Sequence, residues 1–300
     1  MRGPHGQRAA VAFNREQMLK FLRDAAERGA SEVHFKVPNR PMIRDHETGA
    51  LVATTLPALT ARDSQAVVYA LGGLAQVEIP VNQLTDTEFS FGLPGVGRFR
   101  AYVFRQRGSV CAIVKRVETN VPTMADFSAP PEADEAIGRP GLTLVAGARN
   151  EELLAACVDA FNRRSRGHVW LIESPLSYLH RDGTAAISQR EVPTDVPDFP
   201  AGIHKAMRIG VDLLVVREVA DRPTADALLT AAERGLAVVA SIAAPDAEDA
   251  SWWVSRLFEG EHRRDAERRI AAQLRTILLL PATGAAQVHD TRSAMRVVAS

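Results

Sequence analysis

The turn at residues 147–152 stands where nucleotide-binding proteins place their phosphate loop. An apolar stretch, LTLVA, ends just before Gly147, and a helical pattern resumes by Leu154. A phosphate loop aims successive backbone N–H groups inward, which requires several glycines, a Lys for the outer phosphates and a Ser or Thr hydroxyl for Mg²⁺. Here the turn reads GARNEE, with Gly147 as its only glycine, Arg149 as its only cation, and neither Lys nor hydroxyl. We therefore expect no nucleotide cofactor at this turn.

The residues that stand in place of a phosphate loop suit an ordinary helix start. Asn150 is a good N-cap, and Glu151 and Glu152 fall in the first helical turn, where a carboxylate complements the helix dipole by about 0.3 to 1 kcal/mol. A triphosphate would meet two like charges here, each opposing it by roughly 3 kcal/mol at about 5 Å and an effective dielectric near 20. The pattern predicts a capped helix whose own carboxylates occupy the anion site.

Two further apolar stretches end in carboxylates that could assist hydrolysis. Glu173 follows HVWLI, and Glu218 follows LLVVR, a stretch that begins just after Asp212. A carboxylate at the end of such a strand can polarise an attacking water. Arg217 stands directly before Glu218, and a cation there would pair with the carboxylate and lower its basicity. We therefore expect Glu218 to form a structural salt bridge. The histidines show no ligand spacing, so we expect no metal site.

The bulk composition excludes several classes of protein. The chain has 300 residues and 46% hydrophobic content, enough for a sizeable core and, at about 150 residues per domain, for two domains. Lys plus Arg and Asp plus Glu are equal at 36 each, so no global field attracts nucleic acid. Cys111 and Cys157 lie far apart among apolar neighbours, as reduced thiols do. No apolar stretch suits a signal peptide or a membrane span, so we expect a cytoplasmic protein without membrane insertion.

The patterns before residue 118 predict a small α+β domain. NREQMLKFLRDAAERGA places Met18 and Leu22 on one helical face behind an Asn14 cap, and TARDSQAVVYALGGL predicts a second helix. The alternation in SEVHFKV predicts a strand, and TEFSFGLPGVGRFRAYVFRQRGSVCAIVKRV predicts a meander of three strands. The predicted domain covers residues 14–117 and follows a loose tail at residues 1–13.

The signals change after this domain. Residues 118–140 hold four prolines and predict a linker. Residues 141–300 then alternate short apolar runs with helical patterns, in the order LTLVA, ELLAACVDAFNRR, HVWLIES, FPAGIHKAMRIG, VDLLVV, RPTADALLTAAERG and LAVVASIAA. Buried strands separated by helices predict parallel βαβ units with right-handed crossovers. The second domain is therefore predicted to be α/β.

Five stretches resemble the twitching-motility ATPases that retract type IV pili, within the superfamily of type II and type IV secretion motors. In chain order they are RGASEVHF at 28–35, TDTEFSFGLPGVGRFR at 85–100, QREV at 189–192, LLVVREVAD at 213–221 and LTAAERG at 229–235. The resemblance covers nearly the whole chain. It implies a RecA-like core with the P-loop NTPase fold, a PAS-like N-terminal domain and assembly into a hexameric ring.

The motifs that carry chemistry in this family differ here, so the resemblance is to a degenerate member. A loop like GPTGSGKST is matched by GARNEEL, about three residues shorter when anchored on the next helix. The family motif IEDPIEFVH is matched by IESPLSYLH, which keeps Glu173, and the histidine box GTLHT by ASIAA, where Ala243 replaces the histidine. Asp212 and Glu218 match the Walker B acids. The family continues into a C-terminal section with an AIRNL-type motif, which retraction needs, and we expect no counterpart of it here.

The family also sends arginines from its N-terminal domain to a neighbour's nucleotide. Arg98, Arg100 and Arg107 match those positions, which implies an intersubunit role. Arg98 and Arg100 also alternate along a predicted strand, so they could equally line its solvated face.

These observations favour a pseudo-ATPase, a regulatory or structural subunit of type IV pilus or secretion machinery. Its expected partner is a protein: an intact pilus or secretion ATPase or the inner-membrane platform, within a homo- or hetero-oligomeric ring. The alternative is a slow but active ATPase that uses ATP with Mg²⁺, Glu218 and the N-domain arginines Arg98, Arg100 and Arg107, with Arg149 in place of the lysine. A third hypothesis, a binding module for a cyclic dinucleotide held by those three arginines, rests on their charge alone.

Overall fold

The computed structural model describes residues 13–45 and 48–290, and the chain divides into two compact units between Glu118 and Thr119. Most of the tail predicted for residues 1–13 lies outside the described residues. Phe13, its last residue, is instead part of the core: it is 2% exposed and its ring lies 5.8 Å from that of Phe35.

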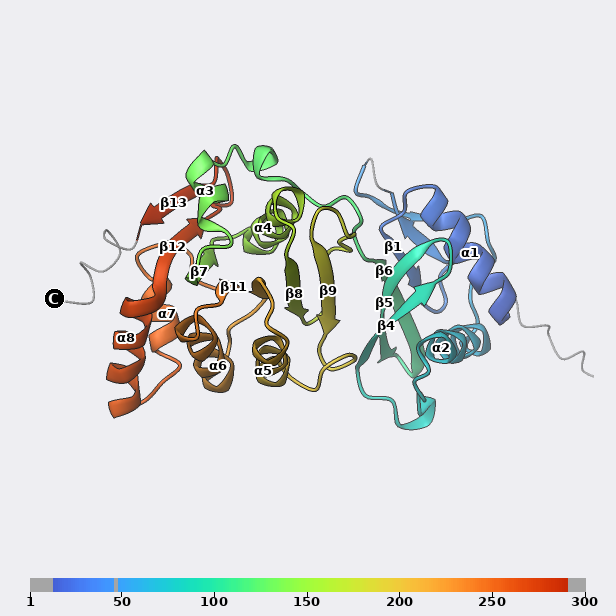
Figure 1. Ribbon diagram of the computed structural model, residues 1–300. Helices are drawn as coiled ribbons and strands as arrows, with labels where there is room; N and C mark the ends of the chain where they lie inside the picture. Colours follow the sequence, from blue (N-terminus) through green and yellow to red (C-terminus); the bar gives the residue numbers. More distant parts are fainter. Residues whose placement is uncertain (1–12, 46–47, 291–300) are drawn as a thin grey trace, which may run out of the picture. The chain divides into compact units, whose positions relative to one another are not determined.

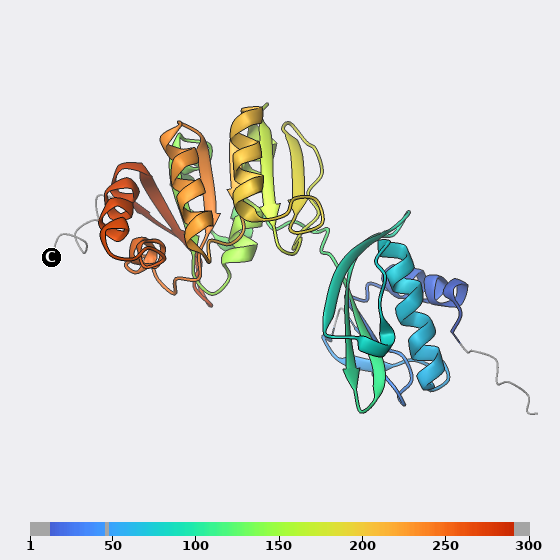
Figure 2. The same ribbon diagram turned by 90° about the horizontal axis from the view of Figure 1, so that it is seen from below.

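The first unit is a six-stranded antiparallel sheet with α1 and α2 packed on one face (Figures 1 and 2). Its elements are α1 Arg15–Glu27, β1 Glu32–Phe35, β2 Met42–Arg44, β3 Leu51–Ala53, α2 Ala61–Ala75, the 3-10 helix η1 Val81–Gln83, β4 Thr87–Leu93, β5 Gly97–Gln106 and β6 Ser109–Arg116. The strand order is β3-β2-β1-β6-β5-β4. The predicted meander is the run β4, β5 and β6.

The start of α1 confirms the predicted cap. The Asn14 side chain accepts a hydrogen bond from the backbone N–H of Gln17 at 2.8 Å, and the Gln17 side chain accepts one from the N–H of Asn14 at 2.9 Å. This reciprocal pair satisfies two backbone donors that a helix start otherwise leaves open. Met18 and Leu22 then follow at helical spacing and are fully buried. The cap and the apolar face together direct α1 onto the sheet.

The second unit is a seven-stranded sheet with helices on both faces. Its elements are η2 Met124–Phe127, α3 Pro131–Ala136, β7 Gly141–Ala146, α4 Asn150–Arg164, β8 His168–Glu173, β9 Ala186–Glu191, α5 Phe199–Ile209, β10 Leu213–Val216, α6 Arg222–Glu233, β11 Ala237–Ser241, α7 Ala250–Ser255, α8 Glu261–Gln273, β12 Leu274–Leu279 and β13 Gln287–Asp290. The strand order is β13-β12-β7-β11-β10-β8-β9, with β13 antiparallel at one edge and the other pairs parallel. The predicted α/β class is confirmed.

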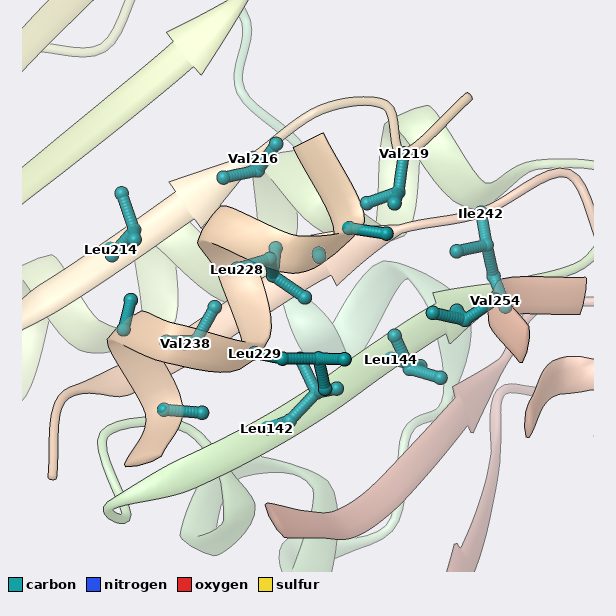
Figure 3. Packing of buried hydrophobic residues seen from close by; sticks show 14 of the residues in the cluster. Leu142, Leu144, Leu214, Val216, Val219, Leu228, Leu229, Val238, Ile242 and Val254 are labelled. Atoms are coloured by element: carbon teal, nitrogen blue, oxygen red, sulfur yellow. The ribbon is translucent and has the colours of Figure 1, made fainter. Parts of the chain in front are cut away.

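Strand β7 shows why the sequence of this sheet is apolar without interruption. Leu142 and Leu144 belong to one buried cluster with Leu229 of α6 and Val254 of α7 (Figure 3). Val145 points to the opposite face and joins the cluster beneath α4. A strand covered on both faces has no solvated side to mark with polar residues. Full burial of each such side chain stabilises the fold by about 1.5 to 3 kcal/mol.

Residues 119–140 differ from the predicted linker. They belong to the second unit, where η2 and α3 contact α4. Met124, Phe127 and Ile137 are buried in the same cluster as the core of α4. The prolines here shape short turns and begin α3 at its first residue, Pro131, rather than mark a free segment. The linker prediction gave too much weight to proline content and too little to these apolar residues.

The parallel arrangement sets where chemistry could take place. The strands β7, β8, β10 and β11 run in one direction, so the residues that follow them meet along one edge of the sheet, which we call the carboxyl edge. Open α/β sheets bind ligands at this edge. Within the described ranges, no helix is both long and apolar enough to cross a membrane.

Candidate functional site at the carboxyl edge

Three residues, Gly147, Ala148 and Arg149, join β7 to α4 at the carboxyl edge. The backbone N–H of Gly147 donates to the carbonyl of Ala244, after β11, at 2.9 Å. Gly147 has φ +100°, and a Cβ at this position would lie 2.2 Å from the carbonyl oxygen of Leu280, after β12. A packing constraint thus accounts for this glycine without reference to a phosphate.

The start of α4 differs from the predicted cap. Arg149 occupies the N-cap position and makes no capping hydrogen bond with its side chain, while Asn150 is the first helical residue. The Asn150 side chain donates from Nδ2 to the carbonyl of Ile242 at 2.8 Å, across to the loop that follows β11. The predicted N-cap at Asn150 was therefore wrong, because a long-range acceptor engages the amide. Asn150 ties the helix start to the neighbouring strand.

The glutamates of the first turn pair with side chains. Glu152 accepts from Nε of Arg149 at 3.0 Å and also contacts the other end of the same guanidinium. This hydrogen bond raises the pKa of Arg149 above its usual value, so the side chain stays cationic. The guanidinium carbon also lies 5.2 Å from the centre of the Phe127 ring. Arg149, the one cation of the turn, is thus already engaged on two sides.

Arg217 is another cation of the carboxyl edge, and it reaches from the end of β10 to α4. Its guanidinium forms an ion pair with Glu151 and donates from Nη1 to the carbonyl of Pro175 at 2.8 Å. The Glu151 carboxylate also accepts from the Ser177 hydroxyl at 3.4 Å. Arg217 therefore connects the first turn of α4 to the loop after β8.

Glu218 does not form the predicted salt bridge. It is exposed, and within the part of the chain that the structure describes it makes no hydrogen bond or ion pair. The prediction failed because Arg217, its neighbour in sequence, turns toward Glu151 instead.

Asp212 lies at the opposite end of β10 from Glu218. Its carboxylate accepts from the backbone N–H of His168 at 2.7 Å, where β8 begins. The four residues of β10, at about 3.3 Å each, hold Asp212 roughly 13 Å or more from the carboxyl edge. The structure therefore does not bring the two matched Walker B acids together, and Asp212 bridges two strands.

Glu173 ends β8 and is only 4% exposed. It accepts from Nε2 of Gln189 at 3.1 Å and from the backbone N–H of Ser177 at 3.5 Å. Burial raises the pKa of Glu173 to about 7, a rise that Arg217 and these hydrogen bonds limit. Burial also lowers the pKa of His180 to about 4, so its ring is neutral near pH 7. Sequence reasoning did not single out Gln189 or His180 individually.

Little space remains between these groups. A cavity of about 10 Å³ lies among Glu151 and Leu154 of α4, Glu173 of β8, His180 and Arg217. A single water needs about 10 to 15 Å³, so nothing as large as a phosphoryl group fits between α4 and the end of β8 in this arrangement. Ala243, at the position of the histidine box, is exposed and offers only a methyl group.

The three arginines of the first unit lie on and beside β5. Arg98 and Arg100 are half-buried and alternate with the core residues Phe99 and Ala101. Arg100 pairs with a glutamate of β4 and lies 4.7 Å from the centre of the Tyr102 ring. This alternation agrees with the interpretation that Arg98 and Arg100 line the solvated face of the strand. It does not test whether they contact a neighbouring subunit. Arg107 is in the turn after β5 with φ +50°. Over the described ranges, no three His, Cys, Asp or Glu side chains are grouped to hold a metal.

The fold and this edge define the class: an α/β protein with helices on both faces of a mainly parallel sheet. No family model matches the chain. The type IV pilus retraction ATPase PilT of Pseudomonas aeruginosa is 28% identical over 265 residues, 87% of this chain and 76% of the relative. The type IV pilus ATPase PilU of the same organism is 26% identical over 263 residues, 86% and 68%. A crystal structure of the pilus retraction motor PilT with bound ADP superposes with TM-score 0.76 at 28% identity, covering 90% of this chain and 80% of that one.

The chain is thus a homologue of the PilT and PilU twitching-motility ATPases. The resemblance inferred from the sequence is confirmed, as is the fold class. The PAS-like character of the first unit stays a prediction.

Proposed function

We propose that this chain is a pseudo-ATPase of the cytoplasm, a regulatory or structural subunit for type IV pilus or secretion machinery. The observation that carries the proposal is the pairing at the carboxyl edge. Arg149 and Arg217, two cations of this edge, are paired with Glu152 and Glu151. To bind a nucleotide, the protein would have to break both pairs and leave two carboxylates facing the phosphates, each opposing them by roughly 3 kcal/mol at about 5 Å.

The retained features point to a role in assembly. Both units keep extensive cores, so the homology to motor ATPases is matched by a fold able to present the same surfaces. The same fold can serve different functions, because function depends on the sites that it carries. A chain that keeps the packing of a motor ATPase without its phosphate site could still present the surfaces through which such proteins assemble. We propose that it joins a ring with an intact ATPase of the same family or acts on one.

Titration calorimetry of the full chain with Mg²⁺ and ATP tests the absence of a nucleotide site. We expect no saturable heat up to about 1 mM nucleotide. A dissociation constant near 10 μM would contradict the proposal, and it would also add about 2.7 kcal/mol of stability at a hundredfold excess of ligand. A pull-down of this chain from its native cell, probed for an intact retraction ATPase, tests the partner. Absence of a complex between this chain and each candidate ATPase, when the two are purified and mixed, would contradict the assembly role.

One observation keeps a slow ATPase as the second candidate. The Glu218 carboxylate is exposed and bound to no other described residue, so it is open to a water molecule. The matched control is Glu218→Gln, which keeps the shape and removes the charge. Phosphate release by the native chain well above that of the variant would favour the enzyme, and equal rates would eliminate it.

A further inference from the structure

The buried end of β8 holds the Glu173 carboxylate, which lies near the guanidinium of Arg217. Glu173 faces Gln189 and, across the strand register, Glu191 of β9. The loop after β8 adds the N–H of Ser177 and the neutral ring of His180. Asp195 lies just beyond, where it accepts from the backbone N–H of Glu191 at 2.9 Å.

The remaining elements complete this environment. From α4 comes Glu151, and from the end of β10 comes Arg217. On the other face of β8, α5 presents Gly202 and Ile203, which carry no charge. Of the described residues that line the small cavity, Arg217 is the only one with a positive charge. Glu151 and Glu173 therefore compete for the same guanidinium.

The two competitors differ in exposure. The Glu151 side chain is 53% exposed, so water can solvate its charge when the arginine leaves. Glu173 is 4% exposed beside a cavity of about 10 Å³, which has no room for more than one water. A buried carboxylate that loses its proton needs a partner far more than a solvated one does. The pKa of Glu173, raised by burial to about 7, places this loss near neutral pH.

We propose that Arg217 is a proton-dependent latch that exchanges partners between Glu151 and Glu173. With Glu173 neutral, Arg217 holds Glu151 and the carbonyl of Pro175, and so joins α4 to the loop after β8. When Glu173 releases its proton to solvent, its carboxylate draws Arg217 inward, and the ion pair that ties the first turn of α4 to that loop is lost. The carboxyl edge then has two arrangements, selected by pH. This latch does not depend on whether the edge binds a nucleotide.

A double-mutant cycle tests the exchange. Glu151→Gln, Arg217→Met and the double variant are unfolded in urea at about pH 6 and about pH 8, in the native background and again with Glu173→Gln. In the native background we expect the non-additive part of the midpoint shifts to fall by at least about half between the two pH values. With Glu173→Gln it should stay constant. Equal non-additivity at both pH values with Glu173 present, or the same decrease with Gln in its place, would overturn the proposal.

Hydrogen exchange provides a second measurement if the Arg217 variant fails to fold. The backbone amides of residues 174–180 are followed in the full native chain at about pH 6 and about pH 8, after correction for intrinsic exchange. We expect their protection to change about threefold or more in the native chain and to stay constant in Glu173→Gln. Unchanged protection in the native chain would also overturn the latch.

Discussion

The close approach of Gly147 to Leu280 predicts that Gly147→Ala is strongly destabilising. The added Cβ would lie 2.2 Å from the carbonyl oxygen of Leu280 and 2.7 Å from its carbonyl carbon. Both are backbone atoms, and the N–H of Leu280 is bound to the carbonyl of Ala146 at 3.0 Å. The turn and the end of β12 therefore cannot separate without loss of a hydrogen bond between strands.

The size of the effect follows from two contributions. A non-glycine residue at positive φ costs about 1 to 2 kcal/mol, and overpacking that forces a backbone shift costs about 1 to 3 kcal/mol more. We therefore expect Gly147→Ala to lower the free energy of unfolding by about 2 to 5 kcal/mol, measured by urea denaturation with the slope of the transition unchanged.

Gly284→Ala is the matched control for this prediction. Gly284 has φ +101°, nearly the same as Gly147, but no heavy atom lies within 4 Å of its added Cβ. It should lose only the conformational part, about 1 to 2 kcal/mol. Equal losses in the two variants would refute the argument that the contact with Leu280 is what requires glycine at position 147.

Three further predictions concern the carboxyl edge. Because the pKa of Glu173 rises from 4.5 to about 7 on folding, the native chain should lose up to about 3 kcal/mol of stability as pH rises through that window. Urea denaturation of Glu173→Gln should show a flatter dependence of stability on pH. Equal pH profiles for the native chain and the variant would count against the burial argument. Asn150→Asp cannot donate to Ile242 and should cost about 1 kcal/mol or more, whereas a gain in urea midpoint would restore the N-cap interpretation. Glu218→Gln should change the free energy of unfolding by less than about 0.5 kcal/mol; a larger loss would reveal a partner for this side chain.

Much of the fold follows from local patterns. The cap at Asn14 and the spacing of Met18 and Leu22 predicted α1, and the apolar run LTLVA predicted a strand buried on both faces. These signals are strong because each depends on residues within one or two turns or on one strand. They do not require knowledge of which distant segment packs against them.

The missed elements lack such signals. Strand β9 has one fully buried residue in six, and β13 has none in four, so neither shows an apolar run. Both lie at the edges of their sheet, where one side pairs with a neighbour and polar side chains are tolerated. The helix α3 is only six residues long and lies among prolines, so the proline content of this segment predicted a linker instead of a helix.

The sequence alone determined that the turn after β7 has one glycine, no lysine and no hydroxyl, since these are facts of composition that no fold can alter. It also carried the homology to pilus motor ATPases. Only the tertiary structure decided which partner each charged or polar group takes. Arg217 binds Glu151, 66 residues away, rather than the adjacent Glu218, and Asn150 binds the carbonyl of Ile242, 92 residues away, rather than its own helix. The physical reason is that parallel strands bring distant segments together at one edge, where charge and hydrogen-bonding geometry outweigh proximity in sequence.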